Sequence, residues 1–287
     1  MSIECSSTVS PTTQVALNAP ASAPVAPGSK VYDTLEGFAL ARKILAQTLP
    51  FEPHDFQVEG ICAVLDGRDL LATMATGSGK TGFFIMLMLV MRAISEDDAL
   101  ALGGRTFPKD PAMIVVCPTK ALQQDMVSST LCLYIGRFIE MNILKSTKMI
   151  KLGLKSLVIN SDTYSDAQRN GRDLWDEVRE GFTMVLLSPE ELASRGFFKL
   201  LEDARFSDRI SALGVDEVHL IYWWGKSLRP AFRRLGNVRA RLPSKNGQRV
   251  PVLGITATLR VGEPMECVQQ VLGLVPGQYR FIRRSNV

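Results

Sequence analysis

The chain has 287 residues, 46% of them hydrophobic and 22% charged, which is typical of a globular protein with a substantial core. The longest apolar run, residues 82–91, falls short of the roughly 20 residues that span a bilayer, and no secretory signal is visible, so we expect no membrane partner. The formal net charge is only +4, yet nine Lys and Arg residues and no Asp or Glu lie between Val218 and Gly262. Such a segment is often just a solvated face, but it favours a polyanionic partner.

The five cysteines stand at positions 5, 62, 117, 132 and 267. Their number is odd, and no two of them have the spacing of a metal-ligand pair such as C-x-x-C. The cysteines therefore predict reduced thiols of an intracellular protein, and neither a zinc site nor a disulfide framework.

Residues 1–30 are rich in Ser, Thr, Pro and Ala, and Glu4 and Lys30 are their only charges. Because such a segment cannot bury enough apolar surface to offset its ordering entropy, we predict a disordered tail. A helical stripe of apolar residues begins after Thr34, and a second helix is expected over Phe56–Leu65.

Short β-rich runs then alternate with helical segments along the rest of the chain. This alternation predicts an α/β fold with a mostly parallel sheet and helices on both faces. In such sheets ligands bind at the carboxyl ends of the strands. The candidate strands are Leu70–Thr73, Met113–Cys117, Leu157–Asn160, Met184–Leu187, Leu213–Asp216 and Val252–Thr256.

The loop after the first candidate strand has the composition of a phosphate-binding loop, although Met74 stands where the usual pattern begins with Gly. Glycines allow the backbone to close around phosphates, and the amides at the start of the following helix face the anion. Lys80 would hold the β- and γ-phosphates, and the Thr81 hydroxyl would ligate Mg²⁺. An ordinary glycine-rich turn is the alternative. The residues expected to bind the nucleotide here are Thr76, Gly77, Ser78, Gly79, Lys80 and Thr81.

Two short motifs follow later strands. Asp216-Glu217-Val218-His219 comes after an apolar run, so that Asp216 would hold Mg²⁺ and Glu217 would polarise the attacking water. Thr256-Ala257-Thr258 ends the last candidate strand, where the hydroxyls of Thr256 and Thr258 would couple the acidic site to a nucleic-acid face. The candidate catalytic residues are Lys80, Asp216, Glu217 and His219.

These three motifs, in this order, resemble the first motor domain of superfamily-two DEAD/DEAH-box helicases, which is a RecA-like P-loop domain. The stretch Phe51-Glu52-Pro53-His54-Asp55-Phe56-Gln57 resembles the F-x-P-x-x-x-Q element of the RecQ-like branch. By that resemblance Phe51 and Gln57 would contact the nucleotide, and Gln57 would read the adenine edge and select ATP over GTP. The alternative for Gln57 is a glutamine on a helix surface.

The resemblance also implies a nucleic-acid face. Residues 224–230 resemble the aromatic-rich loop W-G-x-x-F-R-P of RecQ-like enzymes, although Leu228 replaces the expected aromatic residue. Aromatic and cationic side chains together suit single strands, while one of the adjacent Trp223 and Trp224 is expected in the core. Residues 118–125 and 188–192 resemble two strand-contacting motifs, and Ser188 is alternatively a helix cap. The implied contacts are Thr119, Lys120, Ser188, Trp224, Lys226 and Arg229.

The resemblance implies a helicase ATP-binding domain over residues 31–280, with residues 281–287 as the start of a linker to a second motor domain that we expect to be absent from this chain. Missing C-terminal sequence or a partner chain would supply that second domain. It further implies a nuclear ATP-dependent DNA helicase of 3′-to-5′ polarity that uses ATP and Mg²⁺ on single-stranded or forked DNA, in recombination and repair. DNA is favoured over RNA on the resemblance alone.

Two alternatives remain open. A truncated relative would bind ATP and nucleic acid as a switch without unwinding on its own. Because the second motor domain supplies arginines to the γ-phosphate, we expect the isolated chain to bind ATP but to hydrolyse it slowly. A P-loop kinase or GTPase is disfavoured because the acidic and Thr-Ala-Thr motifs have no role there and a guanine-reading N-K-x-D element is not present.

Overall fold

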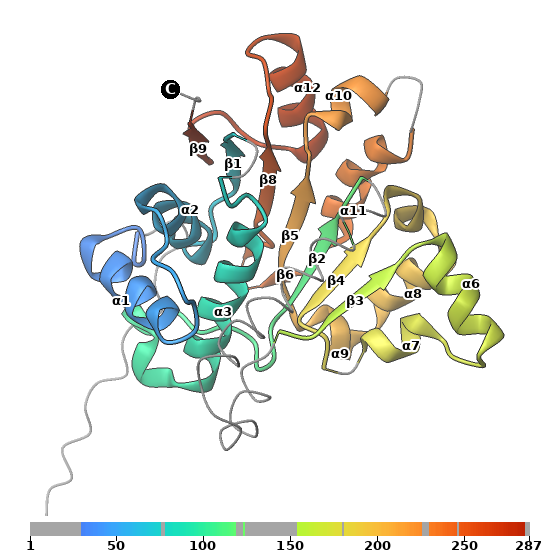
Figure 1. The fold of residues 1–287 in the computed structure, drawn as a ribbon, viewed down its shortest axis with the longest axis horizontal. Coiled ribbons are helices and arrows are strands. Elements are labelled where there is room, and N and C mark those ends of the chain that lie inside the picture. The colour runs from blue at the N-terminus through green and yellow to red at the C-terminus, as the bar shows by residue number, and fades with distance from the viewer. Residues whose placement is uncertain are drawn as a thin grey trace, which may run out of the picture.

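The computed structural model describes residues 30–75, 78–118, 123, 154–179, 181–225, 230–245 and 247–284. Seven strands in these ranges form one sheet with the order β3-β4-β2-β5-β8-β1-β9, and every neighbouring pair is parallel (Figure 1). The strands are β1 (Leu70–Thr73), β2 (Ala112–Val116), β3 (Ser156–Ile159), β4 (Met184–Leu187), β5 (Ile210–Asp216), β8 (Val252–Thr256) and β9 (Arg280–Arg283), with a separate antiparallel hairpin of β6 (Ser244–Lys245) and β7 (Gln248–Arg249).

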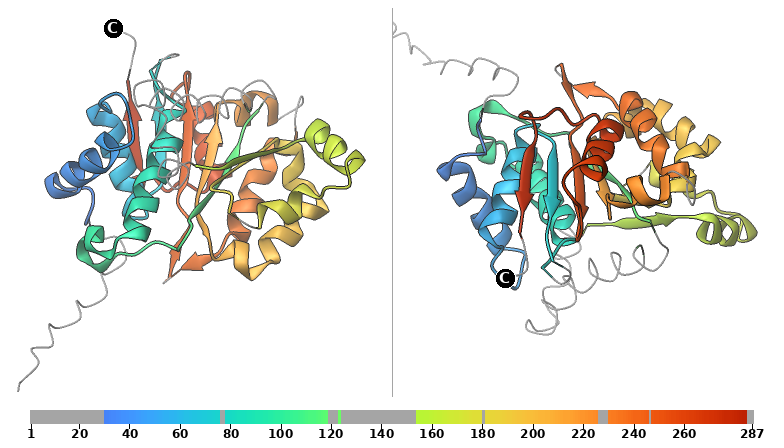
Figure 2. Two further views of the ribbon diagram at one scale, coloured as in Figure 1. Left: turned by 60° about the horizontal axis from the view of Figure 1, so that its bottom comes forward. Right: turned by 90° about the horizontal axis from the view of Figure 1, so that it is seen from above.

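Helices cover both faces of this sheet, as predicted. The first three helices pack on one face, whereas α10, α11 and α12 lie on the other (Figure 2). The helices are α1 (Leu35–Ala46), α2 (Asp55–Leu65), α3 (Gly82–Glu96), α6 (Ser161–Arg169), α7 (Leu174–Val178), α8 (Arg195–Glu202), α9 (Ala204–Ser207), α10 (Leu220–Gly225), α11 (Leu235–Arg241) and α12 (Glu263–Leu272), with 3₁₀ turns η1 (Asp98–Leu100), η2 (Leu102–Gly104), η4 (Pro189–Ala193) and η5 (Pro230–Arg234).

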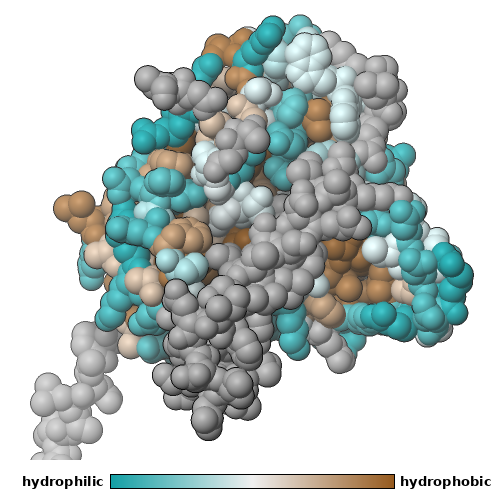
Figure 3. All heavy atoms as spheres, in the orientation of Figure 1, coloured by the Kyte–Doolittle hydropathy of each residue, from teal (hydrophilic) through white to brown (hydrophobic). Residues whose placement is uncertain are grey.

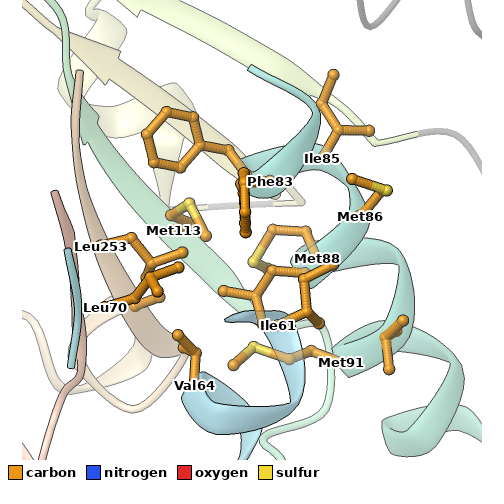
Figure 4. Close-up of a cluster of buried hydrophobic side chains, with 14 of the residues drawn as sticks. Ile61, Val64, Leu70, Phe83, Ile85, Met86, Met88, Met91, Met113 and Leu253 are labelled. Carbon is orange, nitrogen blue, oxygen red and sulfur yellow. The ribbon is translucent and has the colours of Figure 1, made fainter. Parts of the chain in front are cut away.

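Two hydrophobic cores follow from the alternation of side chains along the strands. Met113 and Val115 of β2 join the core beneath α2 and α3, whereas Ile114 and Val116 join the core on the opposite face. Strands buried on both faces read as continuous apolar runs, which is why the sequence shows them plainly. Figure 4 shows the first of these cores, with Phe83 among side chains from α2, α3 and the sheet.

The surface is mainly hydrophilic in the view of Figure 3, where hydrophobic residues show only in small areas. The apolar segment that follows the phosphate loop is buried as the helix α3, which has 15 residues. None of the helices in the described part of the chain has the length and hydrophobicity to cross a lipid bilayer.

For β1, β4 and β8 the bounds predicted from the sequence agree with the structure, whereas β9 was not predicted. Arg280–Arg283 pairs in register with β1, Leu70 lying opposite Arg280. The boundary expected at residue 280 therefore falls inside an edge strand, and residues 281–283, which were expected to begin a linker, complete the sheet. Strand β9 reads Arg-Phe-Ile-Arg, with two apolar residues between two charged ones, and a four-residue edge strand without alternation has no distinctive sequence signal. The expected tail, residues 1–29, lies outside the described residues.

Candidate nucleotide site

The phosphate-loop segment leads from the end of β1 into the first turn of α3. Gly79 has a φ of 77°, a conformation that glycine adopts without strain, and the Gly82 amide donates to the Gly79 carbonyl oxygen at 2.9 Å. The Ser78 hydroxyl donates to the Ala75 carbonyl oxygen at 2.6 Å. A Cβ atom at position 79 would lie 2.9 Å from Gln57 Nε2, so the Gln57 side chain would have to shift. Thr76 and Gly77 lie outside the described residues.

The Lys80 side chain points toward the acidic motif across the carboxyl edge of the sheet. Its Nζ lies 3.3 Å from Glu217 Oε1, and both side chains are largely buried. Thr81 occupies the N-cap position of α3, but its hydroxyl makes no capping hydrogen bond. The structure therefore brings Lys80 to the predicted catalytic carboxylate and leaves the Thr81 hydroxyl available for a ligand.

The acidic motif begins at the carboxyl end of β5, and β8 lies beside it. Glu217 adopts a φ of 46°, which is uncommon for a residue with a side chain and occurs at functional sites. Its Oε2 accepts a hydrogen bond from Thr256 Oγ1 at 3.1 Å and lies 3.2 Å from His219 Nδ1. His219 Nδ1 also lies 2.6 Å from Thr256 Oγ1. Glu217, His219 and Thr256 thus form one network with Lys80.

The two adjacent carboxylates have opposite pKa shifts. Burial raises the pKa of Asp216 to about 6, and the charge of Glu217 adds to the rise, against weaker opposing effects of Lys80 and His219. Burial alone would also raise the pKa of Glu217. Hydrogen bonds from His219 and Thr256 and the positive charge of Lys80 outweigh that effect and lower the pKa to about 2.

This donor set fits a nucleoside triphosphate with its divalent cation. Asp216 is 5% exposed at the end of β5, and burial raises its pKa, so a cation bound beside it would stabilise the charge that burial disfavours. Oxygen donors such as Asp216 and the Thr81 hydroxyl are the ligands that Mg²⁺ prefers. The N-terminal end of a helix such as α3 also favours a bound anion.

Gln57 is buried, at 3% exposure, so it is not a helix-surface glutamine. Its Nε2 donates to the Gly79 carbonyl oxygen at 3.2 Å, and its Oε1 accepts the His54 amide at 3.0 Å. The side chain therefore joins the start of α2 to the phosphate loop. Phe51 lies six residues earlier, with 48% of its surface exposed.

The predicted nucleic-acid residues are only partly within the described structure. Thr119, Lys120, Lys226 and Arg229 lie outside it. Ser188 is buried at the N-cap position of η4, but its side chain makes no capping hydrogen bond, so a capping role is not what the structure shows. Trp224 is half-buried and packs edge-on against Phe232, with ring centroids 6.1 Å apart. Trp223 is the exposed one of the pair, at 54%.

Two residues beside the site had no signal in the sequence. Thr73 Oγ1, at the end of β1, is buried and has no hydrogen-bond partner among the described residues. Arg284 follows β9, where its amide donates to the Thr73 carbonyl oxygen at 2.8 Å and its guanidinium lies 5.1 Å from the centre of the Phe56 ring. Only the pairing of β9 with β1 brings Arg284 here, and the sequence did not reveal that strand.

Comparison with known proteins decides the family. The sequence profile of the DEAD/DEAH box helicases matches residues 54–266, well over half of the chain. The chain belongs to the DEAD/DEAH box helicase family. That range contains the phosphate loop, the acidic motif and the Thr-Ala-Thr motif, and with them all four residues of the network described above.

Relatives confirm the likeness to the RecQ branch of these helicases. The chain is 24% identical over 222 residues to the rat ATP-dependent DNA helicase Q1, with 75% of the chain covered, and 25% identical over 202 residues to RecQ of Haemophilus influenzae, with 70% covered. A Q-like helicase of Arabidopsis thaliana is 24% identical over 203 residues. The matches span only 29%, 25% and 23% of these relatives' own lengths.

Solved helicase structures share the fold. The DUF1998 helicase MrfA, crystallised with DNA and AMPPNP, has a TM-score of 0.55 and 20% identity, covering 85% of this chain and 28% of MrfA. A hypothetical ATP-dependent RNA helicase from Sulfolobus tokodaii has a TM-score of 0.51 and 16% identity, covering 86% of this chain and 57% of that one. These neighbours confirm the RecA-like α/β architecture.

Proposed function

We propose that this chain is the ATP-hydrolysing motor domain of a 3′-to-5′ DNA helicase, with a domain that runs from about residue 31 through β9. The observation that carries the proposal is the network of Lys80, Glu217, His219 and Thr256 at the carboxyl edge of the sheet. Family membership supports ATP as the nucleotide, and the RecQ relatives, which are named ATP-dependent DNA helicases, support DNA as the partner. Single-stranded or forked DNA as the substrate and the nucleus as the location rest on the family resemblance alone.

Lys80 holds different partners before and after ATP binds. In the structure the hydrogen bond from His219 and, next to it, the paired ammonium group of Lys80 keep the pKa of Glu217 low, which makes that carboxylate a weak base. The γ-phosphate would compete for Lys80, and the loss of this cation would raise the pKa of Glu217. The carboxylate would then be a better acceptor for the proton of the attacking water, so that ATP binding itself activates the base.

The other residues have positioning roles. Mg²⁺, held by Asp216 and Thr81, would neutralise charge on the β- and γ-phosphates. Thr256 and His219 fix the carboxylate of Glu217 toward the site, and Gln57 holds the start of α2 against the phosphate loop and would recognise the adenine edge. Phe51, on the same segment, is exposed enough to stack on the base.

ATP hydrolysis by the 287-residue chain, with and without a single-stranded oligonucleotide, tests this function. We expect slow basal turnover, because arginines worth roughly 10³–10⁵ in rate come from the family's second motor domain, outside these 287 residues. We expect the single strand to increase that turnover. Glu217→Gln should still bind ATP while turnover falls by about 100-fold or more, since it cannot take up the proton.

Two results would change the conclusion. ATP binding without any strand-stimulated turnover would favour the alternative of a nucleotide-dependent switch that does not unwind on its own. Wild-type turnover by Glu217→Gln would show that another group activates the water.

A further inference from the structure

A small pocket lies beside the Thr-Ala-Thr motif, outside the network that faces the nucleotide. Its volume is about 250 Å³, and its walls are Trp223 of α10, Thr258, Leu259 and Arg260 of the β8–α12 connection, and Pro264 of α12. Trp223 is 54% exposed, and Arg260 and Thr258 are exposed as well, whereas Leu259 is buried. The pocket thus combines an open aromatic ring, a cation, a hydroxyl and an apolar base.

The two sides of the pocket are fixed to each other. Helices α10 and α12 lie side by side (Figure 1), and the Tyr222 hydroxyl donates to Glu263 Oε2 at 2.9 Å. The Tyr222 ring also meets the Trp223 ring edge-on, with centroids 5.0 Å apart and planes at 80°. Because these contacts hold the indole without covering it, the pocket is preformed, and a ligand would bind without first ordering its walls.

The chemistry of the pocket selects its ligand. An indole and a guanidinium that line the same pocket suit a base by stacking and its phosphate by charge, and the volume is below that of a pocket for a drug-sized molecule. The surrounding segment, Val218–Gly262, carries no acidic residue. We propose that this pocket binds one nucleobase of single-stranded DNA on Trp223, with the adjacent phosphate on Arg260. This inference rests on the proposed motor function and adds a base contact beyond the contacts that the family resemblance implies.

The pocket connects directly to the catalytic network. The Thr258 amide donates to Thr256 Oγ1 at 3.3 Å, and Thr256 Oγ1 in turn donates to Glu217 at 3.1 Å. A base that presses on Thr258 therefore acts on the residue that orients the catalytic carboxylate. Occupation of the pocket would report the presence of a strand to the ATPase site.

Tryptophan fluorescence tests the contact, because the chain has only three tryptophans, at positions 175, 223 and 224. In the full chain with Trp175→Phe and Trp224→Phe, single-stranded oligothymidylate should quench the remaining emission of Trp223. A strand of equal length built from abasic sugar-phosphate units should bind by charge but leave that emission unchanged. Equal quenching by the abasic strand, or none by oligothymidylate that demonstrably binds, would overturn the proposal.

Affinity measurements separate stacking from charge. Trp223→Ala should weaken oligothymidylate binding about 5- to 100-fold and lower strand-stimulated turnover, and Trp223→Phe should restore most of the affinity. Arg260→Gln should reduce the slope of log affinity against log salt by about 0.7, the value for one phosphate of a single strand. Unchanged affinity in Trp223→Ala would exclude base binding in this pocket but would not contradict the motor function. A wild-type chain that binds no single strand at all would refute the motor function itself.

Discussion

Asp216 and Glu217 are neighbours in the chain but have opposite effects on stability. The pKa of Asp216 is raised to about 6, above its value in the unfolded chain, so its contribution to stability is present at low pH and is lost as the pH rises through about 6. The pKa of Glu217 is lowered to about 2, so its contribution is present above its unfolded value and is lost as the pH falls through about 2. At neutral pH the nucleotide-free site therefore contains one carboxylate that destabilises the fold and one that stabilises it.

This contrast predicts that Asp216→Asn stabilises the nucleotide-free chain. At pH 8 the free energy of unfolding should rise by about 1–3 kcal/mol, because the amide removes a buried negative charge and a pKa shift of one unit corresponds to about 1.4 kcal/mol. The gain should shrink as the pH falls from 6 toward 4, where Asp216 of the folded wild type is protonated. Urea denaturation of both chains at pH 5 and pH 8 measures the difference.

Glu217→Gln is the matched control, since it removes one charge at the adjacent position. It should lower the free energy of unfolding at pH 8, because Lys80 and His219 lose their carboxylate partner. Changes of the same sign in the two variants would show that the environments of the carboxylates do not differ as described.

Residue-scale features were predictable where a motif dictates chemistry. The sequence placed Lys80 and Glu217 in one site, and the structure brings them to 3.3 Å. For the adjacent tryptophans it predicted that one lies in the core, whereas Trp224 is only half-buried and packs against the core from outside. The sequence assigned the strand contact to Trp224, but Trp223 has the more exposed ring. Neighbouring side chains of a helix point to different sides, and only the packing of α10 shows which of the two faces outward.

At the scale of elements, one buried carboxylate holds the segment that leads into α1. Asp66, at the C-cap of α2, accepts the backbone amides of Val31, Tyr32 and Asp33 at 2.9–3.1 Å and is 1% exposed. Three amides that would otherwise be unsatisfied are thus paired by one side chain. The contact holds the start of α1 against the end of α2, and nothing in the sequence marks it, since its partners are backbone groups of a distant segment.

Replacing this carboxylate should destabilise the helical layer. Asp66→Asn keeps the shape but puts an amide donor among three donors, so we expect a loss of about 2–4 kcal/mol in the free energy of unfolding. Asp55→Asn, at the other end of α2, alters an exposed salt bridge with Arg42 and should cost less than about 1 kcal/mol. Urea denaturation of both variants measures the costs, and equal losses would mean that the Asp66 contacts add nothing beyond charge.

Across the whole molecule, the order of strands is what the sequence could not supply. Strand β1 lies between β8 and β9, whereas β2, the next strand of this sheet along the chain, lies on the far side of β5. Apolar runs reveal that strands exist, and motifs at their ends reveal that they share an edge, but pairing depends on contacts between distant segments. The fold class and the ATP side of the site were therefore predictable, while β9, Arg284 and the pocket at Trp223 required the structure.

Ligand binding should be visible in the thermal stability of the whole chain. Mg²⁺ and ATP at 100 times the dissociation constant add about 2.7 kcal/mol by mass action, which corresponds to roughly 5–10 °C in Tm for a domain of this size. Lys80→Ala should abolish the rise, because the phosphates lose their cation, whereas Lys199→Ala, exposed on α8, should show the full rise. GTP should raise Tm less than ATP does, and Gln57→Ala should reduce the difference between the Tm increases with the two nucleotides. A wild-type rise in Lys80→Ala would refute the phosphate loop as the binding site, and equal rises with the two nucleotides in the wild type would refute adenine recognition by Gln57.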